Sequence, residues 1–365
     1  AGRPRRDMRA AVLSGFGPAS NMEYREDFPL PREPGKGEVL VEVHASSVNP
    51  VDYKMRKGLI HKVYPIAPFP TVLGFDVSGV VTKVGPNTAL KVGDAVFGRC
   101  AIGKDSSGSY AQYTICREKD IAKKPESMTF ESAAALPIVG LTGLTMLRKL
   151  TKLKSGERVL VFAASGGVGL HTVQVAKALG AAWVGGTCSA RNEELVRSVG
   201  ADEIFDYNAK TTSEILAEAK ADVICDCLGG EDIWEAVVAC EQCTSTTRFV
   251  SAVGGGSKYG GDTPMGVGDM LRVGGQLVGR KIGHAMVGSF RRCPSFDIVT
   301  NISDGDPPTD LNALAEMVAS GRLRVVVDKT FSLQELPAAH EYIESHRARG
   351  KIVINVRGES AAAAE

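Results

Sequence analysis

A glycine-rich turn joins an apolar strand to a helix in this chain, and it limits the possible folds more than any other part of the sequence. Residues 158–163 (RVLVFA) have the apolar, β-branched character of a buried strand, and the hexapeptide ASGGVG follows at 164–169. Apolar residues then recur at helical spacing as far as Leu179, and Gly180 ends the pattern. The strand and the helix are therefore expected to form a βα unit with the turn between them.

Such a turn predicts a dinucleotide site. Gly166 would let the backbone approach a pyrophosphate, and Gly169 would let the helix pack against the strand. Amides at the helix N-terminus would donate to the anion, aided by the helix dipole. Ala164 replaces the first glycine of the usual fingerprint, and the alternative is a tight βα turn without a ligand. The turn offers these candidate cofactor-binding residues: Ser165, Gly166, Gly167 and Val168.

The residues that follow the turn repeat the same pattern of strand and helix. Repeated βα units imply a parallel, doubly wound sheet with right-handed crossovers. The expected strands are 182–186, 203–205, 222–227, 248–253 and 276–282, and the expected helices are 192–199, 213–219 and 233–239.

The rest of the chain has a different character. Before about residue 124, short β-rich segments are separated by Gly and Pro turns, which favours a largely antiparallel domain. After about residue 290 the pattern is mixed, and these elements are expected to rejoin the first domain. The segments expected as strands are 9–13, 39–45, 77–84, 110–115, 325–327 and 351–356, and the late helices are 311–319 and 336–346.

Composition excludes several classes of protein. The chain has 365 residues and a formal net charge of +1, so nothing indicates affinity for nucleic acid. The longest apolar stretch, 133–147, is too short and interrupted to span a bilayer. The eight cysteines contain one CxxC pair, Cys240 and Cys243, which we interpret as buried or free thiols of a reduced protein; a metal or redox pair is the alternative. We expect a cytoplasmic location, with a plastid or mitochondrion as the alternative. The basic residues 1–6 are interpreted as a disordered tail, and a tag remnant or the stub of a transit peptide is the alternative.

The end of the second βα strand distinguishes between the two nicotinamide cofactors. NAD sites place a carboxylate there to hold the ribose hydroxyls. Here no carboxylate occurs before Glu193, whereas Ser189 can donate a hydrogen bond and Arg191 can pair with a 2′-phosphate. We therefore predict NADPH. The alternative is that Ser189 caps the next helix and Arg191 is solvated.

Several motifs together resemble those of one family, the zinc-independent quinone oxidoreductase branch of the medium-chain dehydrogenase/reductases. The similarity spans residues 8–356 and is greatest to plant-type alkenal/enone reductases and chloroplast-envelope quinone oxidoreductase-like proteins. The motifs are VNPVDYKMRKG at 48–58, GFDVSGVV at 74–81, GDAVFG at 93–98, the glycine turn, GAD at 200–202, DY at 206–207 and GKIV at 350–353.

The resemblance implies an α/β fold of two domains with the active site in the cleft between them. A GroES-like, mostly-β catalytic domain would comprise residues 8–133 and 291–357. A Rossmann doubly wound parallel-sheet domain would comprise residues 134–290. Residues 1–7 and 358–365 are expected to be flexible tails. It also implies hydride transfer from NADPH to a small-molecule quinone or to the C=C bond of an α,β-unsaturated carbonyl (an enone). An enoyl-thioester reductase and a non-catalytic NADPH-binding protein are the alternatives.

The resemblance also bears on metal binding. Zinc enzymes of the wider superfamily carry a Cys where this chain has Asn49 and a His where it has Phe75. Neither residue replaces those ligands well. Cys100 and Cys116 lack the partners of a structural zinc lobe. We therefore expect no metal.

Without a metal, another group must stabilise the negative charge that develops on the substrate oxygen. Lys54 is expected to be an electrostatic stabiliser or a cofactor contact, Tyr53 a hydrogen-bond donor to the substrate, and Asn49 a further donor through its amide. The alternative is that Tyr53 packs in the core and Lys54 is solvated.

Further cofactor contacts are implied residue by residue, and packing or turn roles are the alternatives. No role is assigned to His44, His171 or His284. The segment 283–306 is expected to shape the substrate pocket or a subunit contact, as in a homodimer. The implied contacts are Thr142, Tyr207, Leu228, Gly229, Val253, Gly254 and Lys351.

Overall fold

The computed structural model describes residues 7–62, 64–100, 108–229, 231–252, 275, 279, 294–299 and 307–358. Val253, Gly254, His284 and most of the segment 283–306 lie outside the described residues. The chain divides into two compact units. The first unit comprises Ala1–Ile138, Gly305–Glu316 and Val325–Glu365, and the second comprises Val139–Asp304 and Met317–Arg324.

The second unit is built on a six-stranded parallel sheet with the strand order β11-β10-β9-β12-β13-β14. This is the 3-2-1-4-5-6 order of a Rossmann fold, so the predicted doubly wound sheet is confirmed. The strands are β9 (Arg158–Phe162), β10 (Trp183–Cys188), β11 (Glu203–Asp206), β12 (Val223–Asp226), β13 (Arg248–Ser251) and β14 (Ser295–Ile298).

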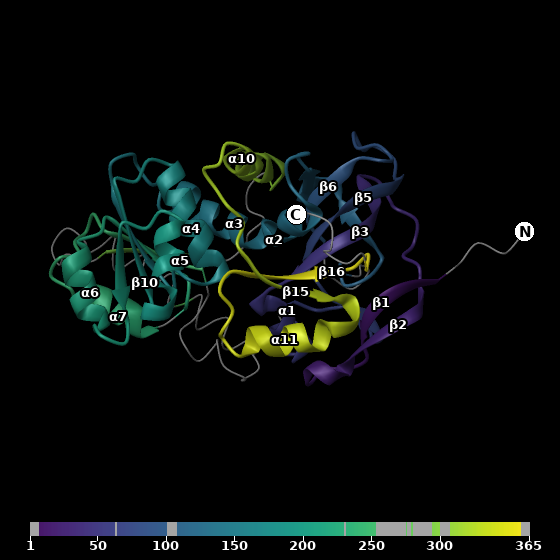
Figure 1. The fold of residues 1–365 in the computed structure, drawn as a ribbon, viewed down its shortest axis with the longest axis horizontal. Helices are drawn as coiled ribbons and strands as arrows, with labels where there is room; N and C mark the ends of the chain where they lie inside the picture. The colour runs from purple at the N-terminus through teal and green to yellow at the C-terminus, as the bar shows by residue number, and fades with distance from the viewer. Residues whose placement is uncertain are drawn as a thin grey trace, which may run out of the picture. The chain divides into compact units, whose positions relative to one another are not determined.

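Helices cover both faces of this sheet. In Figure 1, α4 and α5 lie on one side of β10, and α6 and α7 lie together on the other. Under α6 and α7 the core is aromatic: the Trp234 ring lies 4.8 Å from that of Phe296, and Phe249 stacks on Phe296 at 5.5 Å. The helices are α4 (Gly167–Ala178), α5 (Glu193–Ser198), α6 (Thr212–Ala219) and α7 (Glu231–Ala239).

Two details of the sequence-based assignment are corrected. Residues from 291 onward were expected in the catalytic domain, but β14 hydrogen-bonds to β13 and completes the Rossmann sheet. Its alternating apolar residues, Phe296 and Ile298, pack in the core under α7, and this contact is not visible in a local pattern. The strand expected at 276–282 is wrong at Gly279, which is helical, as is Gly275.

The first unit is mostly antiparallel, as predicted. Its larger sheet has the path β15-β16-β3-β5-β6-β8, β7 pairs with β3, and a smaller sheet has the order β2-β1-β4. Only the β15–β16 pair is parallel among the described strand pairs of this unit. The strands are β1 (Asp7–Leu13), β2 (Met22–Pro29), β3 (Glu38–Val48), β4 (Thr71–Val72), β5 (Asp76–Val84), β6 (Ala95–Arg99), β7 (Tyr113–Arg117), β8 (Ile121–Lys123), β15 (Val327–Ser332) and β16 (Lys351–Asn355).

The C-terminal segment does return to the first unit, because β16 pairs with β3 antiparallel. Helix α11 (Leu336–Glu344) contacts α1 (Pro50–Arg56), and α2 (Phe130–Ala135) packs on β3. Two helices, α3 (Pro137–Leu144) and α10 (Pro307–Ala319), cross from one unit into the other along the chain. No helix among the described residues has the length and apolar character needed to cross a membrane.

Candidate functional site

The glycine turn has the geometry that its sequence predicts. A Cβ atom at Gly169 would lie 2.2 Å from the carbonyl oxygen of Ala163, so only glycine allows α4 to approach β9 this closely. A Cβ at Gly166 would meet only the same oxygen, at 3.4 Å, so the space beside Gly166 is open. Because α4 begins at Gly167, its first amides have no acceptor within the helix. These features fit the pyrophosphate of a dinucleotide.

The structure also explains why alanine is tolerated at the first position of the fingerprint. Ala164 is fully buried, and its methyl group lies 2.8 Å from where a Cβ atom of Gly186 would be. Gly186 belongs to β10, the neighbouring strand. The glycine missing from the turn is thus compensated by a glycine in the adjacent strand.

The end of β10 fixes the turn in place. Thr187 accepts two hydrogen bonds from the start of the turn. Its Oγ1 accepts from the Ala163 N–H at 3.0 Å, and its carbonyl oxygen accepts from the Ala164 N–H at 2.9 Å. Asn192 Nδ2 donates to Ser165 Oγ at 3.1 Å. Ser165, predicted to contact the cofactor, is therefore oriented by the loop that follows β10.

That loop contains Ser189 and Arg191, the residues predicted to select NADPH. The Ser189 hydroxyl is buried and has no hydrogen-bond partner in the described part of the chain. Ser189 precedes a short 3₁₀ turn (Ala190–Asn192) but its side chain does not cap it, so the capping alternative is wrong. Arg191 is exposed and forms no ion pair with a described residue. The Glu193 carboxylate is paired with Arg197 at 2.8 Å.

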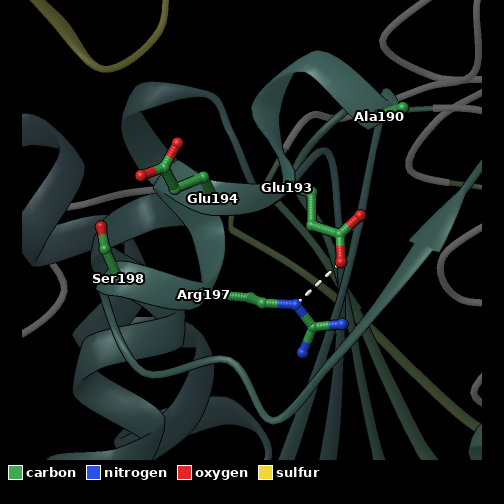
Figure 2. A pocket seen from close by; sticks show the side chains of 5 residues that line it. All are labelled: Ala190, Glu193, Glu194, Arg197 and Ser198. Carbon is green, nitrogen blue, oxygen red and sulfur yellow. Dashed lines mark hydrogen bonds and ion pairs between the residues drawn. The ribbon is translucent and has the colours of Figure 1, made fainter.

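A shallow hollow of about 670 Å³ lies beside this loop over α5. Figure 2 shows its five lining residues, with the ion pair between Glu193 and Arg197. Two carboxylates, Glu193 and Glu194, line it, and no residue of the glycine turn does. Its charge does not suit a phosphate, so we do not assign it to the dinucleotide.

Other predicted cofactor residues follow the carboxyl ends of β11 and β12, where ligands bind in open α/β sheets. Tyr207 and Leu228 are large side chains that are 58% and 66% exposed. Gly229 is buried with φ at +84°, and its N–H donates to Asp226 Oδ1 at 2.9 Å, so a turn role applies to it as well. Thr142 is buried in α3.

In the first unit, Asn49 lies directly before α1, and both polar atoms of its side-chain amide form hydrogen bonds. Asn49 Nδ2 donates to Asp76 Oδ2 at 2.8 Å, and Asn49 Oδ1 accepts from Lys351 Nζ at 2.6 Å. The Asn49 N–H donates to Asp52 Oδ2 at 2.7 Å. Asn49, Asp76, Lys351 and Asp52 are all buried. These contacts tie both side chains into the first unit. The roles expected for Asn49 toward the substrate and for Lys351 near the cofactor stay predictions.

Tyr53 and Lys54 follow on α1. Tyr53 is buried, and the Lys57 ammonium lies 5.7 Å from the centre of its ring. Lys54 is half-buried, and burial lowers the pKa of its ammonium group. Within the described ranges Lys54 has no ion-pair partner. A cation that is partly removed from water and unpaired is suited to stabilise a developing negative charge.

Sequence reasoning missed the buried acidic and aromatic groups around α1. Burial raises the pKa of Asp52 to about 7. The Tyr110 ring lies 5.7 Å from that of His340, and burial, with the nearby Arg56 charge, lowers the pKa of His340 to about 3. Asp52 and Asp76 both lie inside motifs that carry the family resemblance, so those motifs could have pointed to them. His340 lies in no such motif, and no sequence signal points to it.

Comparisons with known proteins are consistent with this architecture. Residues 35–126 match the family model described as "Alcohol dehydrogenase GroES-like domain", and residues 199–354 match the model described as "Zinc-binding dehydrogenase". The mitochondrial NAD(P)H oxidoreductase RTN4IP1 of Mus musculus is 33% identical, over 96% of this chain and 89% of its own length. The chloroplastic NADPH-dependent alkenal/one oxidoreductase of Arabidopsis thaliana is 32% identical, over 96% of this chain and 80% of its own length.

The chain belongs to the quinone oxidoreductase-like medium-chain dehydrogenase/reductases. A solved quinone oxidoreductase from Coxiella burnetii agrees, with a TM-score of 0.75, 29% identity, and coverage of 96% of this chain and 100% of that one. The predicted family, its two-domain α/β fold and its class as an oxidoreductase are thereby confirmed.

In this chain, the residues at the two positions where zinc enzymes of the superfamily carry ligands do not fit a zinc ion. The Oδ1 atom of Asn49, its only atom able to ligate a cation, already accepts from the Lys351 ammonium. A second positive charge there would be repelled. Phe75 has no ligand atom. The description of one matching family model as zinc-binding therefore does not extend to these two positions.

Proposed function

We propose that this protein is an NADPH-dependent, zinc-independent reductase that transfers a hydride to quinones or to the C=C bond of α,β-unsaturated carbonyls. The observation that carries the proposal is the Lys54 ammonium on α1, half-buried and without an ion-pair partner among the described residues. A reaction that places negative charge on a substrate oxygen needs a group of this kind when no metal supplies it.

The choice of NADPH rests on the end of β10. In place of a carboxylate there are a buried Ser189 hydroxyl, which has no hydrogen-bond partner among the described residues, and the exposed guanidinium of Arg191. A hydroxyl donor and a cation suit a 2′-phosphate, whereas a carboxylate would repel it. The name of the Arabidopsis relative also specifies NADPH.

The chain's own residues would act on the oxygen of the substrate. When bound, NADPH supplies the hydride, which an enone receives at its β carbon. Lys54 stabilises the negative charge on the resulting enolate oxygen, and Tyr53 donates a hydrogen bond to the same oxygen. The α carbon then takes its proton from water. Asn49 does not contact substrate in this scheme but orients the start of α1.

The location of the reaction is proposed from relatives alone. Those described above carry the words mitochondrial and chloroplastic in their names. We propose a cytoplasmic or organellar setting, which imaging of the tagged protein in its own cells would test.

The test is steady-state kinetics of the purified protein with a panel of quinones, alkenals and enoyl-CoA thioesters, each with NADPH and with NADH. We expect turnover of quinones or alkenals with NADPH and little with NADH. Turnover of enoyl-CoA alone would instead support an enoyl-thioester reductase, a class represented among similar structures by the CurK enoyl reductase at 25% identity. NADPH binding without oxidation of NADPH across the whole panel would overturn the proposal.

A further inference from the structure

One buried carboxylate holds the starts of two helices in the first unit. Asp76, the first residue of β5, is fully buried. Its Oδ2 accepts from Ser47 Oγ at 2.6 Å and from Asn49 Nδ2 at 2.8 Å, at the residue that precedes α1. Its Oδ1 accepts from the Ile138 N–H at 3.0 Å, in the first turn of α3. The two oxygens of one side chain thus reach two helices that lie far apart in the sequence.

A buried cation balances the charge of this carboxylate. Lys351 Nζ lies 3.4 Å from Asp76 Oδ2 and donates to Asn49 Oδ1 at 2.6 Å and to the Val48 carbonyl at 3.1 Å. Burial lowers the pKa of Lys351, and the nearby Asp76 and Asp52 carboxylates oppose that fall. Both members of the pair lie on the central strands of one sheet, since β3 pairs with both β5 and β16.

The two helices carry residues of the proposed reaction. Tyr53 and Lys54 lie on α1, and Thr142 follows Ile138 by one turn on α3. Misplacement of a reacting or stabilising group by about 1 Å can cost about 100-fold in rate. A rigid anchor at the first turn of each helix would limit such misplacement.

We propose that Asp76, with Lys351 as its buried counter-ion, is a positioning residue that fixes the starts of α1 and α3 and thereby the orientation of Tyr53 and Lys54. The proposal rests on the proposed reductase function for its kinetic consequence. Asparagine cannot replace Asp76 fully, because one of its two polar atoms is a donor and would face donors that Asp76 now accepts from.

The experiment compares Asp76→Asn with the double variant Asp76→Asn/Lys351→Met, which removes both charges. At saturating NADPH we expect kcat of Asp76→Asn with a quinone or alkenal to fall about 100-fold, with KM for NADPH changed less than about threefold. The double variant should recover the thermal unfolding midpoint but not kcat. Recovery of kcat to within about threefold of the unaltered protein would overturn the proposal, because charge balance alone would then explain the pair.

A matched control is Asp120→Asn. Asp120 is also a buried carboxylate of the first unit, but its partners are Arg117 at 2.5 Å and Arg99 at 3.7 Å. Its kcat is expected to stay within about threefold of the unaltered protein. An equal loss of kcat in Asp120→Asn and Asp76→Asn would also overturn the proposal.

A readout independent of turnover is amide hydrogen exchange, followed by mass spectrometry, in peptides that cover 50–56 and 137–144. We expect faster exchange in both peptides for Asp76→Asn and in neither for Asp120→Asn. Unchanged exchange in both peptides of Asp76→Asn would contradict the inference. If Asp76→Asn does not fold, Ser47→Ala removes one donor to the same carboxylate and should speed exchange in 50–56; no change there counts against the inference.

These readouts separate the two proposals. An unaltered protein that oxidises no NADPH with any substrate refutes the reductase function, and the exchange experiment then decides the positioning role alone.

Discussion

The candidate residues of the two units are held in opposite ways. In the second unit the residues lie on short turns after successive parallel strands, and several side chains are exposed, such as Tyr207 and Leu228. In the first unit the central groups are buried charges, and Lys351 and Asn49, which hydrogen-bond, are 302 residues apart. The residues expected to bind the cofactor are thus specified by short local motifs and several of them remain exposed, whereas the residues around α1 are held by buried charges and hydrogen bonds.

This contrast predicts that loss of a buried charge in the first unit destabilises the protein far more than loss of an exposed one. Lys351→Met would leave Asp76 buried without its counter-ion, and we expect the free energy of unfolding to fall by about 3–5 kcal/mol. Lys83→Met, which breaks the exposed 2.6 Å pair with Glu33 in the same unit, should cost less than about 1 kcal/mol. Denaturant unfolding measures both, and equal losses would remove the contrast.

In the second unit, sensitivity should follow backbone packing instead of charge. Gly169→Ala would place a methyl group against the Ala163 carbonyl, and we expect a loss of about 2–3 kcal/mol in unfolding free energy. Gly166→Ala, whose Cβ meets only one atom at 3.4 Å, should change it by less than about 1 kcal/mol. Denaturant titration of the two variants checks this, and a larger loss for Gly166→Ala would show that the turn is packed differently.

The buried groups of the first unit should also give it a two-sided pH dependence. The pKa of Asp52 is raised to about 7, so the folded state keeps a proton that the unfolded state releases, and stability falls as pH rises from about 4 to about 7. The pKa of His340 is lowered to about 3, so stability falls as pH falls from about 6.5 toward 3.

Two variants separate these opposing effects. Relative to the unaltered protein, Asp52→Asn should gain about 2 kcal/mol more in unfolding free energy at pH 8 than at pH 5. His340→Leu should show the reverse, a gain larger by about 2 kcal/mol at pH 5 than at pH 8. Unfolding curves at both pH values provide the measurement. The same pH trend in both variants would contradict the assigned directions.

The smallest expected effect concerns the open edge of the second unit. Arg191→Ala should lower the preference for NADPH over NADH by about tenfold, through loss of one exposed charge-assisted contact to the 2′-phosphate. Arg197→Ala, which removes the cation of the hollow over α5, should leave the preference unchanged. Dissociation constants from cofactor titration decide this. An unaltered preference in Arg191→Ala would reopen the choice of cofactor.

Much of the second unit could be predicted because its signals are short-range. The glycine turn, the alternation of strands and helices and the lack of a carboxylate before Glu193 each occupy a few consecutive residues. The prediction was wrong in the late part of the unit, where β14 joins the sheet through side chains that contact α7 and β13. Such contacts leave no local periodic signature.

The family, the two-domain α/β architecture and the residues available to the site could be predicted from the sequence, because motif order and periodicity can be recognised without knowledge of contacts. The contacts of Asn49 and Lys351, in contrast, became apparent only from the folded structure. Their side chains meet Asp76 because β16 returns to pair with β3, and β3 pairs with β5. Burial at that meeting point makes an ion pair necessary, since an unpaired charge there would be strongly destabilising. No pattern within one segment of the chain can express that requirement.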